Sequence, residues 1–190
     1  MAKVSEEHQV YLDEAGTNLG MTRSHARSPA GERAFYKRPA RRGGNISLVG
    51  AIRLGESPIL YPFDGAVDGE RFLYFLEHRL VPTLRIGDVV IMDNCRIHHL
   101  ADVKTLLSKV GAVPLFMPPY SPELNPIEEA WSLIKTTFKS LEARTISAYV
   151  DALEIARQVV TPEKIRAYVD HAFSFHSTQT QLAQPLSKLG

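Results

Sequence analysis

The sequence predicts an α/β fold, a mixed β-sheet flanked by helices with further helices at the C-terminal end. Between residues 88 and 117, two short apolar runs flank a segment of helical periodicity, and this β-α-β order favours parallel strand pairing. The chain has 190 residues, 44% of them hydrophobic, which is enough to bury a substantial core. We expect residues 1–141 to form the main domain and residues 142–190 to form a helical extension with a polar tail.

Apolar runs place the strands at residues 9–14, 45–54, 58–63, 88–93 and 112–117. The segment between the first two runs, residues 16–44, is polar, basic and interrupted by glycine and proline, which is typical of a long loop. This loop could contain a short edge strand near Phe35. Loops of this length in a compact domain are often functional.

Helices are predicted from apolar side chains that recur at spacings of three and four. Residues 69–80 show this period through Phe72, Leu76 and Leu80, and residues 101–110 are expected to form a second helix. After a proline-rich turn at residues 118–122, helices are expected at residues 126–141, 146–159 and 162–173. The residues after His176 are rich in Gln, Ser and Thr, which predicts a polar tail.

The composition limits the kinds of site and of location. The single cysteine, Cys95, permits no internal disulfide and excludes a cysteine-rich zinc module. The N-terminal stretch lacks the apolar core of a signal peptide, and no segment reaches the roughly 18 apolar residues that a membrane span needs. We therefore expect a cytoplasmic protein with no membrane partner. The net charge of +1 neither demands nor excludes a polyanionic partner.

Three carboxylates stand at positions where a sheet could bring them together. Asp13 and Asp93 each end an apolar run, and ligands of open α/β sheets collect at the carboxyl ends of strands. Strand alternation places Asp13 on the face of Tyr11 and Asp93 on the face of Ile91. The alternative for either aspartate is a simple turn residue, which is the role we expect for Asp64 and Asp88.

The third acid, Glu128, begins a helix. Asn125, Pro126 and Glu128 fit an N-cap, a proline at the first helical position and a capping-box glutamate, so a purely structural role stays open. At about 100° per residue, Glu128 lies beside the apolar stripe of its helix, whereas Glu129 faces solvent. Glu128 is therefore the acid expected to point inward.

Converging carboxylates repel one another unless cations lie between them, and hard divalent ions such as Mg²⁺ prefer oxygen ligands. Two such ions, roughly 3.5–4 Å apart, can activate water or a 3′ hydroxyl and stabilise the leaving oxygen of a phosphodiester. The reaction expected from such a site is phosphoryl transfer on nucleic acid.

Three segments carry a resemblance to a known family. They read Tyr-Leu-Asp-Glu-Ala-Gly around Asp13, Val-Ile-Met-Asp-Asn-Cys-Arg-Ile-His-His around Asp93, and Pro-Pro-Tyr-Ser-Pro-Glu-Leu-Asn-Pro-Ile-Glu-Glu-Ala-Trp around Glu128. The chain resembles mariner-type bacterial insertion-sequence transposases of the DDE superfamily. The 34 residues between Asp93 and Glu128 are similar to the Asp-Asp-34-Glu pattern of that superfamily.

The resemblance, which covers roughly residues 8–140, implies a ribonuclease-H-like fold whose triad Asp13, Asp93 and Glu128 binds Mg²⁺, with Mn²⁺ as a substitute. It implies cleavage and strand transfer of double-stranded DNA at terminal inverted repeats, by a homodimer that is nucleoid-associated when bound. Such transposases carry helix-turn-helix domains ahead of the catalytic domain, and only twelve residues precede Asp13 here. We therefore expect a separately encoded N-terminal portion, as in a two-frame element, or a fragment.

Other residues suggest contacts with DNA. Seven cations and one acid lie between residues 23 and 42, and with Phe35 and Tyr36 among them this segment suits phosphate contacts better than a merely solvated loop. Asn94 and His98, just after Asp93, could orient a carboxylate, contact a phosphate or hold the strand-to-helix turn, and lining of the site is as open as a structural role. The candidate DNA-binding residues are Arg23, Arg27, Arg33, Lys37, Arg38, Arg41, Arg42, Asn94 and His98.

The remaining motif residues have structural interpretations. Cys95 is expected to be a packed thiol and Trp131 the core anchor of its helix, while the proline-rich turn at residues 118–122 is either a rigid connector or a wall facing DNA. Two other functions stay open besides a transposase: a plain metal-dependent nuclease of the same fold, and a catalytically silent DNA-binding remnant.

Overall fold

The computed structural model describes residues 4–23, 25–35, 43–119 and 121–182. Its centre is a mixed sheet of five strands in the order β3-β2-β1-β4-β5. The strands are β1 (Gln9–Asn18), β2 (Asn45–Arg53), β3 (Ile59–Asp64), β4 (Val89–Met92) and β5 (Val113–Phe116). β1, β2 and β3 pair antiparallel, whereas β4 runs parallel to both β1 and β5. The predicted mixed sheet and its parallel β-α-β portion are therefore confirmed.

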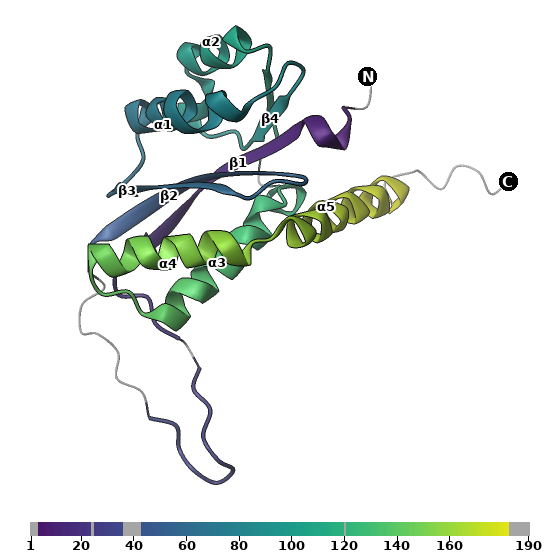
Figure 1. Cartoon of the computed structure of the whole chain (residues 1–190). Helices are drawn as coiled ribbons and strands as arrows, with labels where there is room; N and C mark the ends of the chain where they lie inside the picture. The colour runs from purple at the N-terminus through teal and green to yellow at the C-terminus, as the bar shows by residue number, and fades with distance from the viewer. Residues whose placement is uncertain (1–3, 24, 36–42, 120, 183–190) are drawn as a thin grey trace, which may run out of the picture.

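Helices cover both faces of the sheet. α1 (Gly69–Phe75) and α2 (Ala101–Lys109) lie on one side, and α3 (Ile127–Leu141), α4 (Ile146–Val159) and α5 (Pro162–Leu182) lie on the other (Figure 1). Short turns link them: 3₁₀ turns at Glu6–His8, Val81–Thr83, Arg96–His99 and Pro122–Leu124, and a π-helical turn at Leu76–Leu80. Side chains cap the beginnings of α1, α4 and α5, in which Asp68 accepts from the Arg71 N–H, Thr145 from the Ala148 N–H and Thr161 from the Lys164 N–H.

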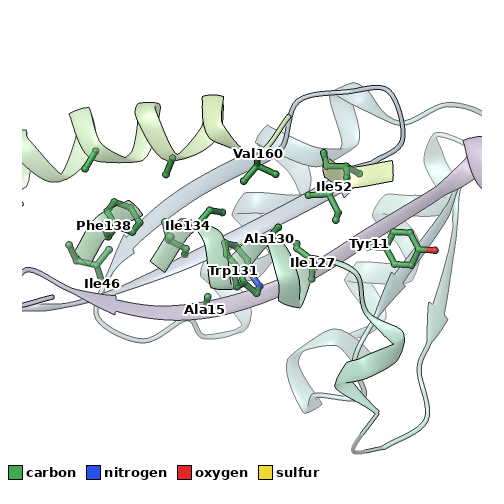
Figure 2. Close-up of a cluster of buried hydrophobic side chains, with 14 of the residues drawn as sticks. Tyr11, Ala15, Ile46, Ile52, Ile127, Ala130, Trp131, Ile134, Phe138 and Val160 are labelled. Carbon is green, nitrogen blue, oxygen red and sulfur yellow. The ribbon is translucent and has the colours of Figure 1, made fainter. Parts of the chain in front are cut away.

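Alternation along β1 divides the core into two clusters. Val10 and Leu12 pack toward α1 and α2, whereas Tyr11 and Ala15 pack toward α3. The apolar stripe of α3 fills the second cluster, and Figure 2 shows Trp131 within it, close to β1. Since residues 11, 13 and 15 share a face, the Asp13 side chain lies on the α3 side of the sheet, as the alternation predicted.

The C-terminal helices belong to the same core. Buried side chains of α4 and α5 join the cluster around Trp131; both helices pack on α3, and α4 also contacts β3. The prediction of a polar tail after His176 is wrong for residues 177–182, because α5 continues to Leu182. Propagation of an existing helix adds one hydrogen bond per residue, and this can extend it through a polar sequence. A domain boundary at residue 141 stays a prediction.

Some boundaries differ from expectation. β1 continues four residues beyond the predicted end at Glu14, because β2 pairs with it as far as Asn18. The predicted helix at residues 69–80 changes to a π-helical turn after Phe75. Phe35 itself is not in a strand, and the residues that follow it, 36–42, lie outside the described residues. Within the described ranges, no helix is long and apolar enough to cross a membrane.

Candidate active site

The parallel pair β1–β4 brings the two aspartates to the same level. Tyr11 of β1 is the register partner of Ile91 in β4, so continuing that register by two residues aligns Asp13 with Asp93. β4 ends at Met92, and Asp93 follows at its carboxyl end, as predicted. The prediction that Asp13 ends its own strand is wrong, because Asp13 lies within β1 opposite Gly50 of β2. The pairing of β1 with β4 ends at Tyr11, two residues before Asp13, and this opens the sheet beside Asp13.

Asp13, Asp93 and Glu128 all line one cleft of about 470 Å³. Residues of the proline-rich turn line the same cleft, and whether this turn is a rigid connector or a wall facing DNA stays a prediction. The other lining residues are Asn94, Cys95, Met117, Pro118, Pro119, Ser121, Pro122 and Asn125. Among the described residues, no three His, Cys, Asp or Glu side chains form a closed cluster suited to a metal ion. The three acids therefore share the cleft without forming a closed cluster.

Asp13 is a partly buried acid with a single side-chain donor. The indole Nε1–H of Trp131 donates to Asp13 Oδ2 at 3.0 Å. Burial raises the pKa of Asp13 to about 7, and although the backbone N–H of Glu14 and the Trp131 indole favour the charged form, the nearby Glu128 and Glu14 carboxylates raise the pKa further. Ionised Asp13 thus lies in a setting where a cation would be strongly favoured.

Glu128 begins α3 but does not act as a capping residue. The prediction of Asn125 as the N-cap and Pro126 as the first helical residue is wrong, because α3 begins at Ile127 with Pro126 at the N-cap. Asn125 lies just before the helix, and its Oδ1 accepts from the Ile127 N–H at 3.4 Å. The reciprocal bond of a capping box would use the backbone N–H of Asn125, and that group donates instead to the Pro122 carbonyl at 2.9 Å. The Glu128 carboxylate is therefore left to the cleft, as its helical phase predicted. Its neighbour Glu129 instead bonds to His171 of α5.

Asp93 is held by the turn that follows it. Its Oδ1 accepts from the backbone N–H of Cys95 at 2.9 Å and lies 2.8 Å from Nδ1 of His98. The Asp93 side chain is 51% exposed, so these contacts fix one oxygen while the carboxylate still faces the solvent of the cleft.

His98 is buried beneath the turn after Asp93, so of the roles left open for it only the phosphate contact is wrong. Its side chain is fully buried, so the ring is not available to contact DNA in this fold. Nε2 lies 2.9 Å from Oε1 of Glu14 and Nδ1 lies 3.1 Å from the Asp93 carbonyl. Burial would lower the pKa of His98, but the bonds to the Glu14 carboxylate and to Asp93 hold it above its ordinary value. With acceptors at both nitrogens, the ring suits the doubly protonated form.

Three other motif residues line the cleft or contact its acids. Cys95 is exposed and lines the cleft, so the prediction of a packed thiol is wrong. Asn94 lines the cleft as well, and its Oδ1 bonds to the ring of His99. Trp131 is the predicted core anchor, 1% exposed, but its bond to Asp13 was not foreseen. A Cβ at Gly50 would lie 2.6 Å from the indole, so the strand opposite Asp13 needs glycine for the ring to fit.

The basic segment extends away from the sheet. In Figure 1 the chain from about residue 20 to residue 35 projects from the body of the molecule, and Arg23, Arg27 and Arg33 within it are exposed. Arg144 anchors its beginning by donating to the carbonyls of Leu19 and Met21. The other four predicted cations, Lys37, Arg38, Arg41 and Arg42, lie outside the described residues.

The donor set of the cleft fits a hard divalent cation. Its charged groups are three carboxylates, and Asp13 in particular is partly buried near other acids, with no cation beside it among the described residues. All-oxygen sets of this kind suit Mg²⁺ or Mn²⁺ rather than softer metals.

Solved structures with a similar fold include mobile-element and viral enzymes. The Mos1 strand transfer complex aligns with a TM-score of 0.69 at 15% identity, covering 96% of this chain and 56% of that one. The Mos1 transposase catalytic domain aligns at 0.56 and 14% identity, covering 87% and 84%. The catalytic core domain of BIV integrase aligns at 0.53 and 13% identity, covering 91% and 99%. The ribonuclease-H-like fold is therefore confirmed.

The chain spans about half the length of the Mos1 transposase chains in their DNA complexes. A search of curated protein sequences finds no match. The sequence profile described as "DDE superfamily endonuclease" matches residues 8–150, which include all three acids of the cleft and most of the chain. On this match, the chain belongs to the DDE superfamily of endonucleases.

Proposed function

We propose that this chain is the catalytic core of a transposase, which cuts DNA strands at the ends of a mobile element and joins the freed 3′ ends to target DNA. The observation that carries the proposal is the convergence of Asp13, Asp93 and Glu128, from three separate parts of the sequence, on one cleft. Membership of an endonuclease superfamily supports it. So does the fold shared with Mos1 transposase in complexes with transposon ends and with Mg or Mn.

In this proposal Asp13 and Asp93 together hold one divalent ion, and Glu128 completes the ligands of a second. Mg²⁺ is the proposed metal and Mn²⁺ its substitute. Bound ions of this kind lower the pKa of a nucleophilic water or hydroxyl and stabilise the charge on the leaving oxygen of a phosphodiester. The nucleophiles are water and then the freed 3′ hydroxyl, so no covalent bond forms between protein and DNA.

The protein itself contributes orientation. The Trp131 N–H fixes one oxygen of Asp13, and the Cys95 N–H fixes one oxygen of Asp93. Asn125 sets the first turn of the helix that carries Glu128. Carboxylates held by neighbours in this way lose little further freedom when they bind a metal or a substrate.

Double-stranded DNA is the proposed partner. Exposed Arg23, Arg27 and Arg33 suit phosphate contacts, whose strength falls as salt rises. We infer a homodimer on paired element ends in the nucleoid, and recognition of those ends by a separately encoded helix-turn-helix portion. The chain's coverage of 56% of the Mos1 chain leaves room for such a portion.

The test is nicking of supercoiled plasmid DNA in Mn²⁺, which needs no knowledge of the element ends. Wild type should nick, and Asp93→Ala should abolish nicking while DNA affinity stays equal or rises slightly, since one repelling charge is lost. Asp64→Ala is the matched control, because Asp64 also ends a strand but is exposed away from the cleft. Equal nicking by Asp93→Ala would overturn the proposal.

The same assay separates the two other functions. A wild-type protein that binds DNA without nicking it in Mn²⁺ would be the silent remnant. A labelled duplex with a free 3′ hydroxyl, added to the reaction, would become joined to the plasmid by a transposase. Nicking without any joining would instead indicate a plain nuclease.

A further inference from the structure

His98 lies behind the cleft, between the sheet and α1. Its ring packs against Phe72 of α1, with the ring centroids 4.5 Å apart. One nitrogen faces Glu14 of β1, the residue next to Asp13, and the other faces Asp93 after β4. The imidazole therefore spans the gap that opens where β4 ends and β1 continues.

We propose that His98 is a positioning residue that orients Asp93 for metal binding and sets its spacing from β1. The inference rests on the proposed function, in which Asp93 is a metal ligand. Asp93 Oδ1 accepts from the Cys95 N–H and lies 2.8 Å from Nδ1 of His98, which also lies 3.1 Å from the Asp93 carbonyl oxygen, so the ring holds both the backbone and the carboxylate of Asp93. Among the described residues no contact engages Oδ2, so this arrangement leaves one oxygen of Asp93 for the cleft.

Burial of the His98 ring restrains its position beside Asp93. The His98 side chain is fully buried while that of Asp93 is 51% exposed, so the ring is fixed by its surroundings and the carboxylate is fixed by the ring. The backbone adds to this, since the His98 N–H donates to the Cys95 carbonyl at 3.0 Å and closes the turn after Asp93. Hydrogen bonds to a metal ligand's outer side commonly change metal affinity by roughly 10–100-fold when they are lost.

Two substitutions test the two ring nitrogens of His98 separately. The amide nitrogen of asparagine reaches about as far as Nδ1, so His98→Asn keeps a donor toward Asp93 and loses the one toward Glu14. The amide nitrogen of glutamine reaches about as far as Nε2, so His98→Gln keeps the donor toward Glu14 and loses the one toward Asp93. Both variants lose the packing against Phe72, so they are matched in that structural cost.

The first experiment is calorimetric titration of Mn²⁺ into the full chain as wild type, Asp93→Asn, His98→Asn and His98→Gln. We expect His98→Gln to bind Mn²⁺ roughly 10-fold more weakly than wild type, with His98→Asn close to wild type. Equal affinities for the two His98 variants, or the reverse order, would overturn the inference. If Asp93→Asn binds like wild type, the metal assignment itself fails, and the inference fails with it.

A second readout needs no metal. The backbone N–H of Cys95 donates to Asp93 Oδ1, so its hydrogen exchange reports whether that carboxylate is held. In His98→Gln the exchange of this amide should be faster than in wild type, while in His98→Asn it should be nearly unchanged. A merely structural role for His98 would affect both variants alike, and that result would count against the inference.

Discussion

The two ends of the β1–β4 pair differ in whether the protein compensates the charge of an aspartate that is taken out of solvent. At the amino end, Asp88 is fully buried and receives two bonds from the Arg53 guanidinium, at 2.9 and 3.0 Å. The Arg85 N–H and the His8 ring also contact its carboxylate. At the carboxyl end, Asp13 has one neutral side-chain donor and no described cation. The first acid is balanced by the protein, and the second is left unbalanced.

The pKa values of the two groups follow this difference. Burial would raise the pKa of Asp88, but the Arg85 N–H and the Arg53 and His8 side chains bring it below its usual value. Burial raises the pKa of Asp13 to about 7, and neighbouring acids add to the effect. An acid whose charge the fold already satisfies is structural, whereas one whose charge is left unsatisfied is suited to a cation from outside the chain.

The largest expected effect comes from removing the cation that balances the charge of Asp88. Arg53→Met keeps the aliphatic length but leaves Asp88 buried without its cation, so we expect a loss of about 3–5 kcal/mol in the free energy of unfolding. Urea unfolding measures it. Arg157→Met removes an exposed arginine paired with Glu154, and should cost less than about 1 kcal/mol. A loss for Arg53→Met as small as the control's would mean that Asp88 is not balanced by Arg53.

The second effect has the opposite sign and comes from the unbalanced end. Between pH 4 and pH 7 folded Asp13 holds its proton more than the unfolded chain does, because its pKa rises from 3.8 to about 7 on folding. Stability is therefore lost as the pH rises through that range. Asp13→Asn removes this loss, and should stabilise the metal-free protein at pH 8 by up to about 4 kcal/mol.

Thermal or urea unfolding in the presence of a chelator, at pH 8 and at pH 4, measures this gain. At pH 4 the gain should nearly vanish, since Asp13 is then protonated in the folded state and partly so in the unfolded chain. Asp93→Asn is the comparison, and should change stability less because its side chain is half exposed. Destabilisation by Asp13→Asn at pH 8 would mean that the burial of Asp13 is not costly.

The sequence could predict much of the end of the sheet that carries Asp13 and Asp93, but little of the end that carries Asp88. The apolar runs before Asp13 and Asp93 predicted the strands that carry them. Strand alternation placed Asp13 with Tyr11 and Asp93 with Ile91, on the face that α3 covers, and helical phase selected Glu128 over Glu129 as the acid that points inward. These are local patterns with periods of 2 and 3.6 residues, and a single sequence carries them. Asp88 was expected only to hold a turn, and it does so through the Arg85 N–H.

The partners of these acids could not be predicted. Arg53 reaches Asp88 across 35 residues, His98 reaches Glu14 across 84, and Trp131 reaches Asp13 across 118. Each contact depends on strand register and on how a helix is seated over the sheet, which no local period encodes. Cys95 was misplaced for a related reason: a small apolar residue after a strand reads as core, but the turn at Asp93 directs it into the cleft.

The smallest effect tests the one donor at the unbalanced end. Trp131→Phe keeps an aromatic ring in the core but removes the N–H that donates to Asp13 Oδ2. Losing a bond to the charged form should raise the pKa of Asp13 further above about 7. Stability should fall by about 1–3 kcal/mol, through the lost hydrogen bond and the smaller ring. An NMR titration of the Asp13 carboxyl carbon measures the pKa.

Ile134→Val is the control that separates the bond from the packing. Ile134 lies one turn further along α3 in the same buried cluster, and its truncation costs about 0.5–1.5 kcal/mol without removing any donor to Asp13. The pKa of Asp13 should stay at its wild-type value in this variant. If Trp131→Phe also leaves the pKa unchanged, the indole bond does not stabilise the Asp13 carboxylate. The pKa of Asp13 would then be set by burial and by its acidic neighbours alone. The protein would compensate the charge at this end of the sheet even less than the contact with Trp131 indicates.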